Sequence, residues 1–406
     1  MLAGMARSNA LAGSGKPLFF RVGNAGGLGL DAPVDRLGEA VRTYVRSLSA
    51  MQKEALVVSR RTGAVWRLAS DEGAYLDGDD EAPCPLSFLT TGMVSSHVEE
   101  ILALARIRGI GIANLRLIQD NFYTMKGSAL KGTMTGGARD VELEAQIESD
   151  AGPEALARLV ADATAASPIN GLMRRRHESL FSLRHNGRAI PCGRVQPMGS
   201  ADVPALPDTA FDAAEPAAGD WRGQIRRNGP TPRTKETTGF AGSSLAENQD
   251  RTLHVRGICT LGPDGVKQIE QQLFNPHGSI FHFLSDEAPV NGGRGLAPDA
   301  CTYISAGIAF CFMTQLGRYA KIAKKDLRDY RIAQDTHFSL GGASGGTGAA
   351  GEAESVETHV ELTTGEDDEF ARNALDISEQ TCFLHALCRG EPRTKVRIRP
   401  HEEAAA

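Results

Sequence analysis

An internal repeat constrains the fold of this chain more than any other feature of its sequence. Residues 82–107, APCPLSFLTTGMVSSHVEEILALARI, align without a gap with residues 297–322, at an offset of 215 positions. The same offset relates the Ser-Asp-Glu triplet at residues 70–72 to the identical triplet at residues 285–287. The offset of 215 positions between the copies is longer than the period of any solenoid repeat. We therefore interpret the sequence as a tandem duplication of a whole domain.

The two copies differ at a pair of cysteines. Cys311 in the second copy is matched by Ser96 in the first, and Cys382 is matched by Ser167. Because both thiols are present in one copy and absent from the other, we expect them to act together. Residues 303–313 around Cys311 are almost all apolar or small, which predicts a helix that is covered on most sides. Free cysteine is also a common core residue, so burial alone does not indicate catalysis.

The predicted elements place the chain in the α+β class, with strands, interspersed helices and strands again. In the second copy, elements are predicted at residues 251–260, 266–273, 279–284, 297–320, 327–340, 356–363, 367–377, 382–388 and 394–398. In the first copy, residues 54–68 read as a hairpin that turns at Thr62 and Gly63. Further strands and helices are predicted at residues 112–123, 141–148, 153–160, 167–176 and 180–183, with a loop at residues 126–140. The spacing of Leu37, Val41 and Val45 favours a helix over residues 36–47.

These patterns divide the chain into four parts. Residues 1–35 form an N-terminal extension, and residues 36–190 form a domain without the cysteine pair. Residues 191–250 are rich in Pro, Ala, Gly and charge, and we expect this linker to cross the surface of both domains and to add structure around Trp221. Residues 251–406 form the domain that carries the cysteine pair.

Composition narrows the function classes. The chain has 406 residues and a net charge of −6. It has seven cysteines, and an odd number of cysteines does not suit a disulfide scaffold. We therefore expect the protein in a reducing cytoplasm. No apolar run reaches the length of about 18 residues that predicts a membrane span, and the amino terminus lacks the apolar core of a secretory signal. We expect no nucleic-acid partner, because a basic, aromatic surface motif is missing. Without a CxxC pattern, we also expect no metal and no cofactor.

The cysteine-bearing segments resemble those of the OsmC/Ohr family. Cys311 lies late in a long apolar helix, a strand pair follows, and a later helix opens with Glu379, Gln380, Thr381 and Cys382. The family usually has a Cys-Pro-Val-Ser-like segment there, whereas this chain has Phe383 and His385 in place of Pro and Ser. The resemblance covers residues 54–190 and 251–400. It implies two OsmC-like α+β domains that intertwine as an intramolecular pseudo-dimer around buried central helices.

The resemblance also implies a chemistry, the thiol-dependent reduction of organic hydroperoxides. Cys311 would be the peroxidatic thiol and Cys382 the resolving one. The family places an arginine and a carboxylate near the reactive thiol, and sequence leaves both choices open. The candidate carboxylates are Asp299 and Glu287, and His385 is placed one helical turn from Cys382. The candidate arginines are Arg294, Arg256, Arg60, Arg61 and Arg67.

Other interpretations remain open at the level of sequence. Cys311 could attack a carbonyl substrate, with His385 or His282 as its base. The chain could instead be a non-catalytic module whose apolar pocket holds a small hydrophobic ligand and whose cysteines sense redox state. The repeated Ser-Asp-Glu triplets could cap turns, and Cys301 and Cys388 look like bystanders. The expected partners are a small hydroperoxide or hydrophobic ligand and a thiol reductant, with the chain as a monomeric pseudo-dimer or as a homodimer.

Overall fold

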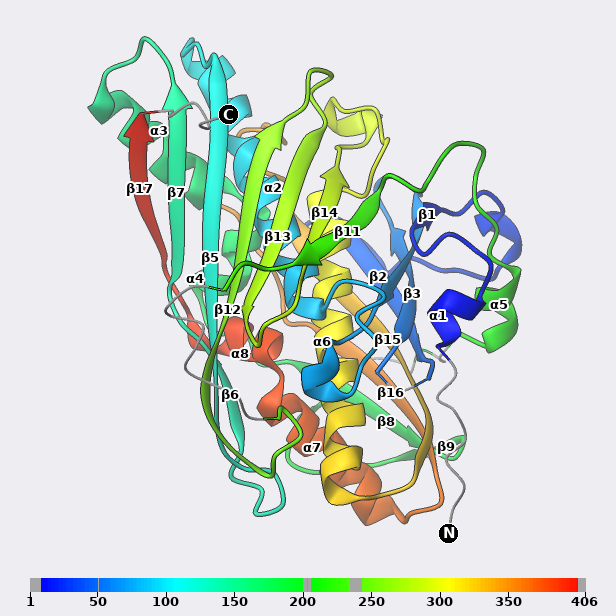
Figure 1. Cartoon of the computed structure of the whole chain (residues 1–406). Helices are drawn as coiled ribbons and strands as arrows, with labels where there is room; N and C mark the ends of the chain where they lie inside the picture. Colours follow the sequence, from blue (N-terminus) through cyan, green and yellow to red (C-terminus); the bar gives the residue numbers. More distant parts are fainter. Residues whose placement is uncertain (1–8, 50, 200–202, 204–205, 234–242, 401–406) are drawn as a thin grey trace.

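A computed structural model describes residues 9–400, apart from residues 50, 200–202, 204–205 and 234–242. Two sheets enclose two long helices (Figure 1). The first half contains α1 (Ala10–Gly13), β1 (Phe20–Arg21), β2 (Gly38–Ser47), β3 (Lys53–Ser59), β4 (Val65–Ser70), α2 (Pro85–Arg108), β5 (Asn114–Ser128), β6 (Thr135–Ala138), β7 (Val141–Glu148), α3 (Pro153–Ala166), α4 (Pro168–Arg174), β8 (Leu180–His185) and β9 (Arg188–Ile190).

The remaining elements form the linker and the second half. The linker carries β10 (Gln196–Pro197), α5 (Asp208–Ala213) and β11 (Ile225–Pro230). The second half contains β12 (Asn248–Leu261), β13 (Lys267–Asn275), β14 (Ser279–Ser285), α6 (Ala300–Ala323), β15 (Leu327–Ser339), β16 (Glu357–Thr364), α7 (Asp368–Thr381), α8 (Phe383–Gly390) and β17 (Thr394–Pro400). The α+β class predicted from the sequence is confirmed.

Each sheet is built from strands of both halves. The first sheet has the order β1-β4-β3-β2-β15-β16-β8-β10, and the second has the order β11-β14-β13-β12-β5-β7-β17. The halves join where β2 runs antiparallel to β15 and where β12 runs antiparallel to β5, in the registers Val41↔Thr336 and Val255↔Asn121. The sheets also match in their parallel pairs, β16 with β8 and β17 with β7. The order and the pairing of the elements therefore repeat along the chain, with the halves intertwined.

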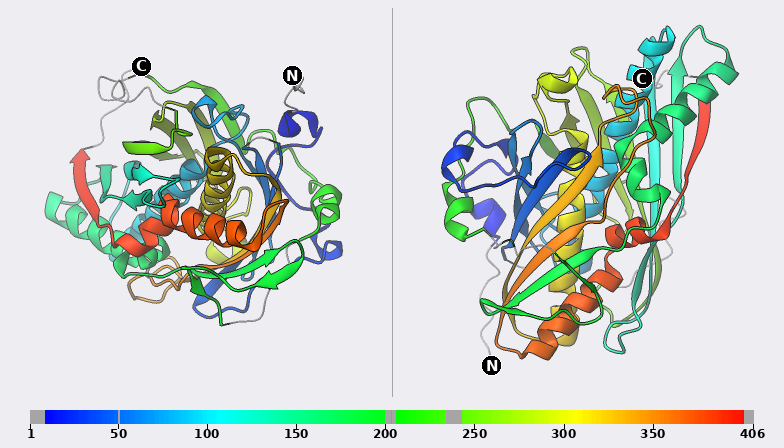
Figure 2. Two further views of the ribbon diagram at one scale, coloured as in Figure 1. Left: turned by 90° about the horizontal axis from the view of Figure 1, so that it is seen from below. Right: turned by 180° about the vertical axis from the view of Figure 1, so that it is seen from behind.

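The two long helices form the inner layers. Helix α6 packs against β2, β3 and β15 of the first sheet, and α2 packs against β12, β13 and β5 of the second. The helices also pack against each other, and Figure 2 shows them between the sheets. Their closest approach is at two glycines: a Cβ at Gly92 would lie 2.6 Å from Ile304 Cγ1, and a Cβ at Gly307 would lie 2.7 Å from the Leu89 backbone nitrogen.

Two predictions of local structure are wrong. Residues 36–47 do not form a helix, because Gly38–Ser47 is strand β2, which lies between β3 and β15 and is buried along most of its length. Leu37, Val41 and Val45 are spaced by four residues, which fits one face of a strand as well as one face of a helix, and this spacing was mistaken for a helical one. Residues 126–140 are not only a loop, since β5 runs on to Ser128 and β6 lies within the segment.

The linker contacts both sheets. Strand β10 pairs with β8 in the first sheet, and β11 pairs with β14 in the second. The expected structure near Trp221 is present: its ring meets that of Trp66 edge to face, with centroids 5.6 Å apart. Phe211 of α5 packs with Phe20 and Val22 on a second cluster of buried side chains.

The expectation that no segment is apolar enough for a membrane span needs correction. Helix α6 is long and apolar enough by length and composition, with a mean hydropathy of 1.3 in its most apolar window. However, 94% of that window is buried inside the protein. The core helix of a soluble protein passes the same test, so this one helix is weak evidence for a membrane.

The contact between α2 and α6 gives a stability prediction. Gly307→Ala should lower the free energy of unfolding by about 1–3 kcal/mol, because the added methyl group meets backbone of the facing helix that cannot rotate away. The intrinsic helix preference of alanine over glycine, about 1 kcal/mol, opposes this loss but does not cancel it. Urea unfolding measures the effect.

Gly111→Ala is the matched control, since a Cβ there meets no heavy atom within 4 Å. It should change stability by less than about 0.5 kcal/mol. Equal stabilities of the two variants would contradict the close contact between the helices.

Candidate active site

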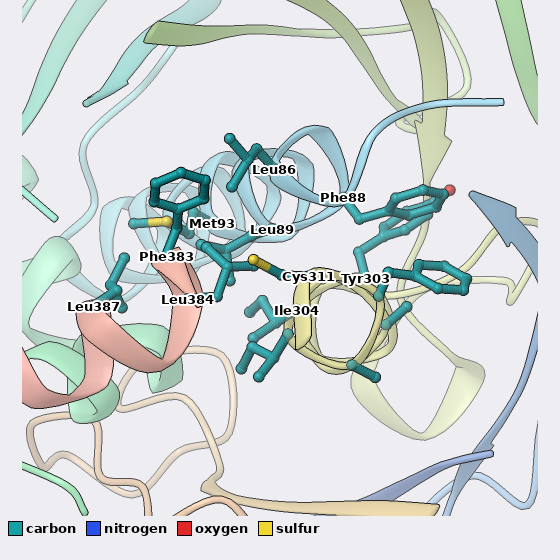
Figure 3. Close-up of a cluster of buried hydrophobic side chains, with 14 of the residues drawn as sticks. Leu86, Phe88, Leu89, Met93, Tyr303, Ile304, Cys311, Phe383, Leu384 and Leu387 are labelled. Carbon is teal, nitrogen blue, oxygen red and sulfur yellow. The ribbon is translucent and has the colours of Figure 1, made fainter. Parts of the chain in front are cut away.

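Cys311 and Cys382 meet in the core. Cys311 lies in the middle of α6 and is 2% exposed, whereas Cys382 is the fully buried residue that precedes α8. The two side chains are hydrogen-bonded, and both thiols are free. In Figure 3 the Cys311 side chain points away from α6 into the space between α2 and the start of α8, where Leu384 lies. The structure therefore places two reduced thiols in contact.

The start of α8 shapes the environment of the Cys311 sulfur. Burial raises the pKa of the Cys311 thiol well above its ordinary value, and the hydrogen bond to Cys382 adds to the rise. The backbone N–H groups of Leu384 and Phe383 act in the other direction, because donors at a helix N-terminus stabilise a negative sulfur. The resting site thus holds Cys311 as a thiol, and its ionisation depends on nearby cations.

A small cavity lies beside Cys311, which is one of its lining residues. Its apolar walls include Leu76, Leu86, Met125, Leu253, Leu273, Pro276 and Phe383, and its polar lining includes Glu72, Tyr75, Arg251, Thr314, Gln315 and Arg318. Glu72 and Tyr75 belong to the loop before α2, and Arg251 belongs to β12. Both halves of the chain therefore contribute to one site.

Glu72 is the carboxylate of this cavity. Its oxygens accept hydrogen bonds from the Tyr75 hydroxyl at 2.7 Å and from Thr314 Oγ1 at 2.9 Å. Burial raises the pKa of Glu72, and the charge of Lys53 partly offsets the rise. Lys53 is itself fully buried, and its Nζ donates to the Met51 carbonyl oxygen at 2.6 Å. Because its pKa is raised, Glu72 can exchange a proton closer to neutral pH than an ordinary carboxylate.

A second cavity is lined by Ser96, the serine that matches Cys311. Ser96 Oγ and Ser167 Oγ are hydrogen-bonded at 2.7 Å, so hydroxyls take the place of the thiol pair. Glu287 and Asp299 line this cavity, and Lys267 forms ion pairs with Glu287 at 3.0 Å and with Glu99. Burial raises the pKa of Glu287 to about 7.

The prediction that Glu287 or Asp299 assists Cys311 is therefore corrected. Because strands of the two halves pair with each other, the loop before each long helix lies beside the long helix of the other half. Glu72 therefore faces α6, and Glu287 faces α2. Asp299 is the N-cap of α6, where it accepts from the Thr302 backbone N–H at 2.7 Å. In the repeated triplet, Asp286 accepts from the backbone N–H groups of Arg294 and Leu296, which confirms a structural role for that aspartate.

The arginines predicted from sequence lie elsewhere. Arg294 is half exposed and pairs with Asp264 at 2.8 Å, and Arg256 pairs with Asp120. Arg67 donates to Glu54, Arg61 donates to Asn291 beside the serine cavity, and Arg60 is in the turn that follows β3. The Cys311 cavity instead has Arg251 and Arg318, which sequence reasoning missed. Arg318 is seven residues after Cys311 and therefore on the same helix face, a signal that was available in the sequence.

The two histidines considered as bases do not face the cavity. His385 is fully buried, neither ring nitrogen has a hydrogen-bond partner in the described part of the chain, and its ring packs against Phe181 and Phe312. Burial lowers the pKa of His385 to about 3, so the ring is neutral and does not hydrogen-bond a thiol. His282 lies on β14, with its Nε2 3.6 Å from Glu270. Within the described ranges, no three His, Cys, Asp or Glu side chains are grouped as metal ligands would be.

Comparisons with known proteins match the cysteine-bearing half. The family model for OsmC-like proteins matches residues 293–397, which include Cys311 and Cys382. The chain is also similar to an OsmC-like hydroperoxide resistance protein of known crystal structure from Jannaschia sp. CCS1. The identity is 21%, the match covers 32% of this chain and 79% of the other, and the TM-score is 0.19. No protein with a curated description matches.

The buried histidine gives a prediction of pH dependence. The unfolded chain protonates His385 below about pH 6.5, whereas the folded protein does so only below about pH 3. Unfolding therefore takes up a proton between these values, and His385 lowers the free energy of unfolding by up to about 1.4 kcal/mol per pH unit as pH falls. His385→Phe should remove this contribution and flatten the acid side of the stability profile.

Urea unfolding of both proteins between about pH 8 and about pH 4.5 measures the difference. The comparison at the alkaline end, where histidine is neutral in both states, isolates the change in packing. Parallel pH profiles for the two proteins would show that His385 titrates normally.

Proposed function

We propose that this chain, which matches the family model of OsmC-like proteins over residues 293–397, reduces organic hydroperoxides with Cys311 and Cys382 as its redox pair. One observation carries the proposal: the two thiols are hydrogen-bonded beside a cavity that also holds an arginine and a carboxylate, Arg251 and Glu72. The cavity is lined mostly by apolar side chains, which suits the organic part of such a substrate.

The proposed reaction has two steps. The Cys311 thiolate attacks one oxygen of the hydroperoxide, the O–O bond breaks, and an alkoxide leaves and takes a proton to become an alcohol. The sulfenic acid on Cys311 is then attacked by the sulfur of Cys382, which forms a disulfide and releases water. Two electrons pass from the thiols to the hydroperoxide, and an external thiol reductant returns them by exchange with the disulfide.

Arg251 and Glu72 take the assisting roles in this scheme. The guanidinium of Arg251 stabilises the negative charge of the thiolate and of the departing alkoxide. Glu72, with its raised pKa, accepts the thiol proton and delivers it to the alkoxide. The site lacks a histidine in its described lining, so this arrangement favours peroxide reduction over attack on a carbonyl substrate.

The proposal extends to the whole chain. We assign residues 36–190 and 251–406 as two OsmC-like repeats that form an intramolecular pseudo-dimer, joined by the linker at residues 191–250 and preceded by the extension at residues 1–35. The repeated order and pairing of the strands support this assignment. The half with Ser96 and Ser167 then serves as scaffold and supplies Glu72 to the thiol site. A cytoplasmic location, where thiol reductants are present, suits the cycle.

Peptide mapping by mass spectrometry tests the proposal. One equivalent of an organic hydroperoxide should convert the Cys311 and Cys382 peptides into a single disulfide-linked species, because the two thiols are already in contact. Cys311→Ser should abolish the linked peptide and the loss of hydroperoxide. Cys259 is a buried cysteine outside the cavity lining, so Cys259→Ser should leave the linked peptide and the loss of hydroperoxide unchanged. Two unmodified thiols in the presence of persisting hydroperoxide would refute the proposed reaction.

Glu72 and Glu287 occupy matching positions and provide a matched pair of variants. Glu72→Gln should slow hydroperoxide reduction by at least about tenfold, because it removes the group that moves the proton. Glu287→Gln should leave the rate nearly unchanged, since Glu287 lies in the serine cavity. Stopped-flow measurement of hydroperoxide consumption gives both rates. Equal rates in the two variants would exclude the role assigned to Glu72.

A further inference from the structure

Two arginines of the Cys311 cavity are buried without a carboxylate partner in the described part of the chain. Arg251 is 7% exposed and Arg318 is 2% exposed, and neither forms an ion pair there. The nearest carboxylate that acts on Arg251 is that of Glu72, which already accepts hydrogen bonds from two hydroxyl groups. Most buried arginines are balanced by a carboxylate, so this pair needs an explanation.

A linker residue holds the two guanidinium groups together. Ser244 is fully buried, and its carbonyl oxygen accepts from Arg318 Nε at 2.8 Å, while its hydroxyl accepts from Arg251 Nη1. The backbone N–H of Ser244 is fixed in turn by the Tyr75 carbonyl oxygen at 2.9 Å. Arg318 has two weaker contacts, from Nη1 to Gln315 Oε1 at 3.3 Å and from Nη2 to Met134 Sδ at 3.2 Å. All of its contacts are neutral.

Arg251 has an unused donor at the cavity. Its buried Nε has no hydrogen-bond partner among the described residues, which leaves a charged N–H group unsatisfied. Burial lowers the pKa of Arg251 to about 10 and that of Arg318 to about 9, and the positive charge of Arg251 contributes to the second shift. Both groups therefore remain protonated at neutral pH. Two like charges held together in a site of low dielectric constant repel each other, and an anion between them relieves the repulsion.

We propose that Arg251, Arg318 and Ser244 form a binding subsite for the carboxylate of an apolar organic acid. The planar guanidinium groups suit the two oxygens of a carboxylate, which they bind through paired charged hydrogen bonds. The other walls of the cavity are apolar and include Leu76, Leu253, Leu273 and Phe383, so they accept the hydrocarbon part of the ligand.

This subsite does not depend on the proposed function. If the chain reduces hydroperoxides, an organic acid bound at the subsite occupies Arg251, the guanidinium that assists Cys311, and shares the cavity with that thiol, so the acid competes with the hydroperoxide. Binding of the acid itself needs no thiol. Binding and peroxide reduction therefore succeed or fail separately.

Isothermal titration calorimetry of the full chain with octanoate tests the subsite. Octanoate should bind at a single site, and octanamide, which has the same hydrocarbon chain without the charge, should bind at least about tenfold more weakly. The titration uses the reduced protein without any hydroperoxide, which separates this result from any result on peroxide reduction. Equal binding of octanoate and octanamide, or no binding of either, would overturn the proposal.

Substitutions locate the site. Arg318→Gln should weaken octanoate binding by at least about tenfold, and Arg318→Lys should retain part of it, since the charge is kept but the paired geometry is lost. Arg294→Gln is the matched control, because Arg294 is half exposed and pairs with Asp264 outside this cavity, and it should leave binding unchanged. Thermal unfolding establishes that each variant is folded. Octanoate binding that survives unchanged in folded Arg318→Gln would place the ligand elsewhere and overturn the assignment.

A second readout uses the thiol as a reporter. Octanoate should slow the alkylation of Cys311 by iodoacetamide, because the ligand and the thiol share one cavity, and octanamide at the same concentration should have a much smaller effect. This measurement needs only the unmodified protein, so it decides the proposal even if the arginine variants do not fold. Equal alkylation rates with and without octanoate would contradict the shared cavity.

Discussion

The antiparallel pairing of β2 with β15, and of β12 with β5, positions the two sheets, the two long helices and the thiol cavity. These two ladders join the halves of the chain edge to edge, so neither sheet exists without strands from both. The same pairing brings α2 and α6 together at Gly92 and Gly307, where only hydrogen atoms fit between the helices. The thiol cavity is then closed by a loop from one half and a helix from the other.

One difference between the halves changes the charge balance of the two cavities. Lys53 pairs with Ser70 in its hairpin as Lys267 pairs with Ser285, so the two lysines occupy matching places. Burial lowers the pKa of Lys267, but Glu287 and Glu99 outweigh this effect and raise it. At the thiol cavity, Thr314 stands where the repeat has Glu99, and burial leaves Lys53 with a lowered pKa despite Glu72. At this matched position the serine cavity has a carboxylate that the thiol cavity lacks.

Most of the local structure could be predicted from the sequence, because it depends on patterns of neighbouring residues. The serines that match Cys311 and Cys382 drew attention to these two cysteines, and the structure places their side chains in contact. The strand at residues 38–47 was missed, because the four-residue spacing of Leu37, Val41 and Val45 fits one face of a strand as well as one face of a helix. Arg318 was missed although its spacing from Cys311 placed it on the same helix face.

The sequence by itself determined the α+β class, most of the order of the elements and the offset of 215 positions that relates the two halves. Only the tertiary structure decided which of the two loops before the long helices faces Cys311. Glu72 and Glu287 are equivalent by sequence, and the choice between them depends on strands that pair across the two halves of the chain. Such pairing is long-range, so no local pattern in the sequence records it. The same holds for Ser244, a linker residue that becomes part of the site only because the chain passes between Tyr75 and the two arginines.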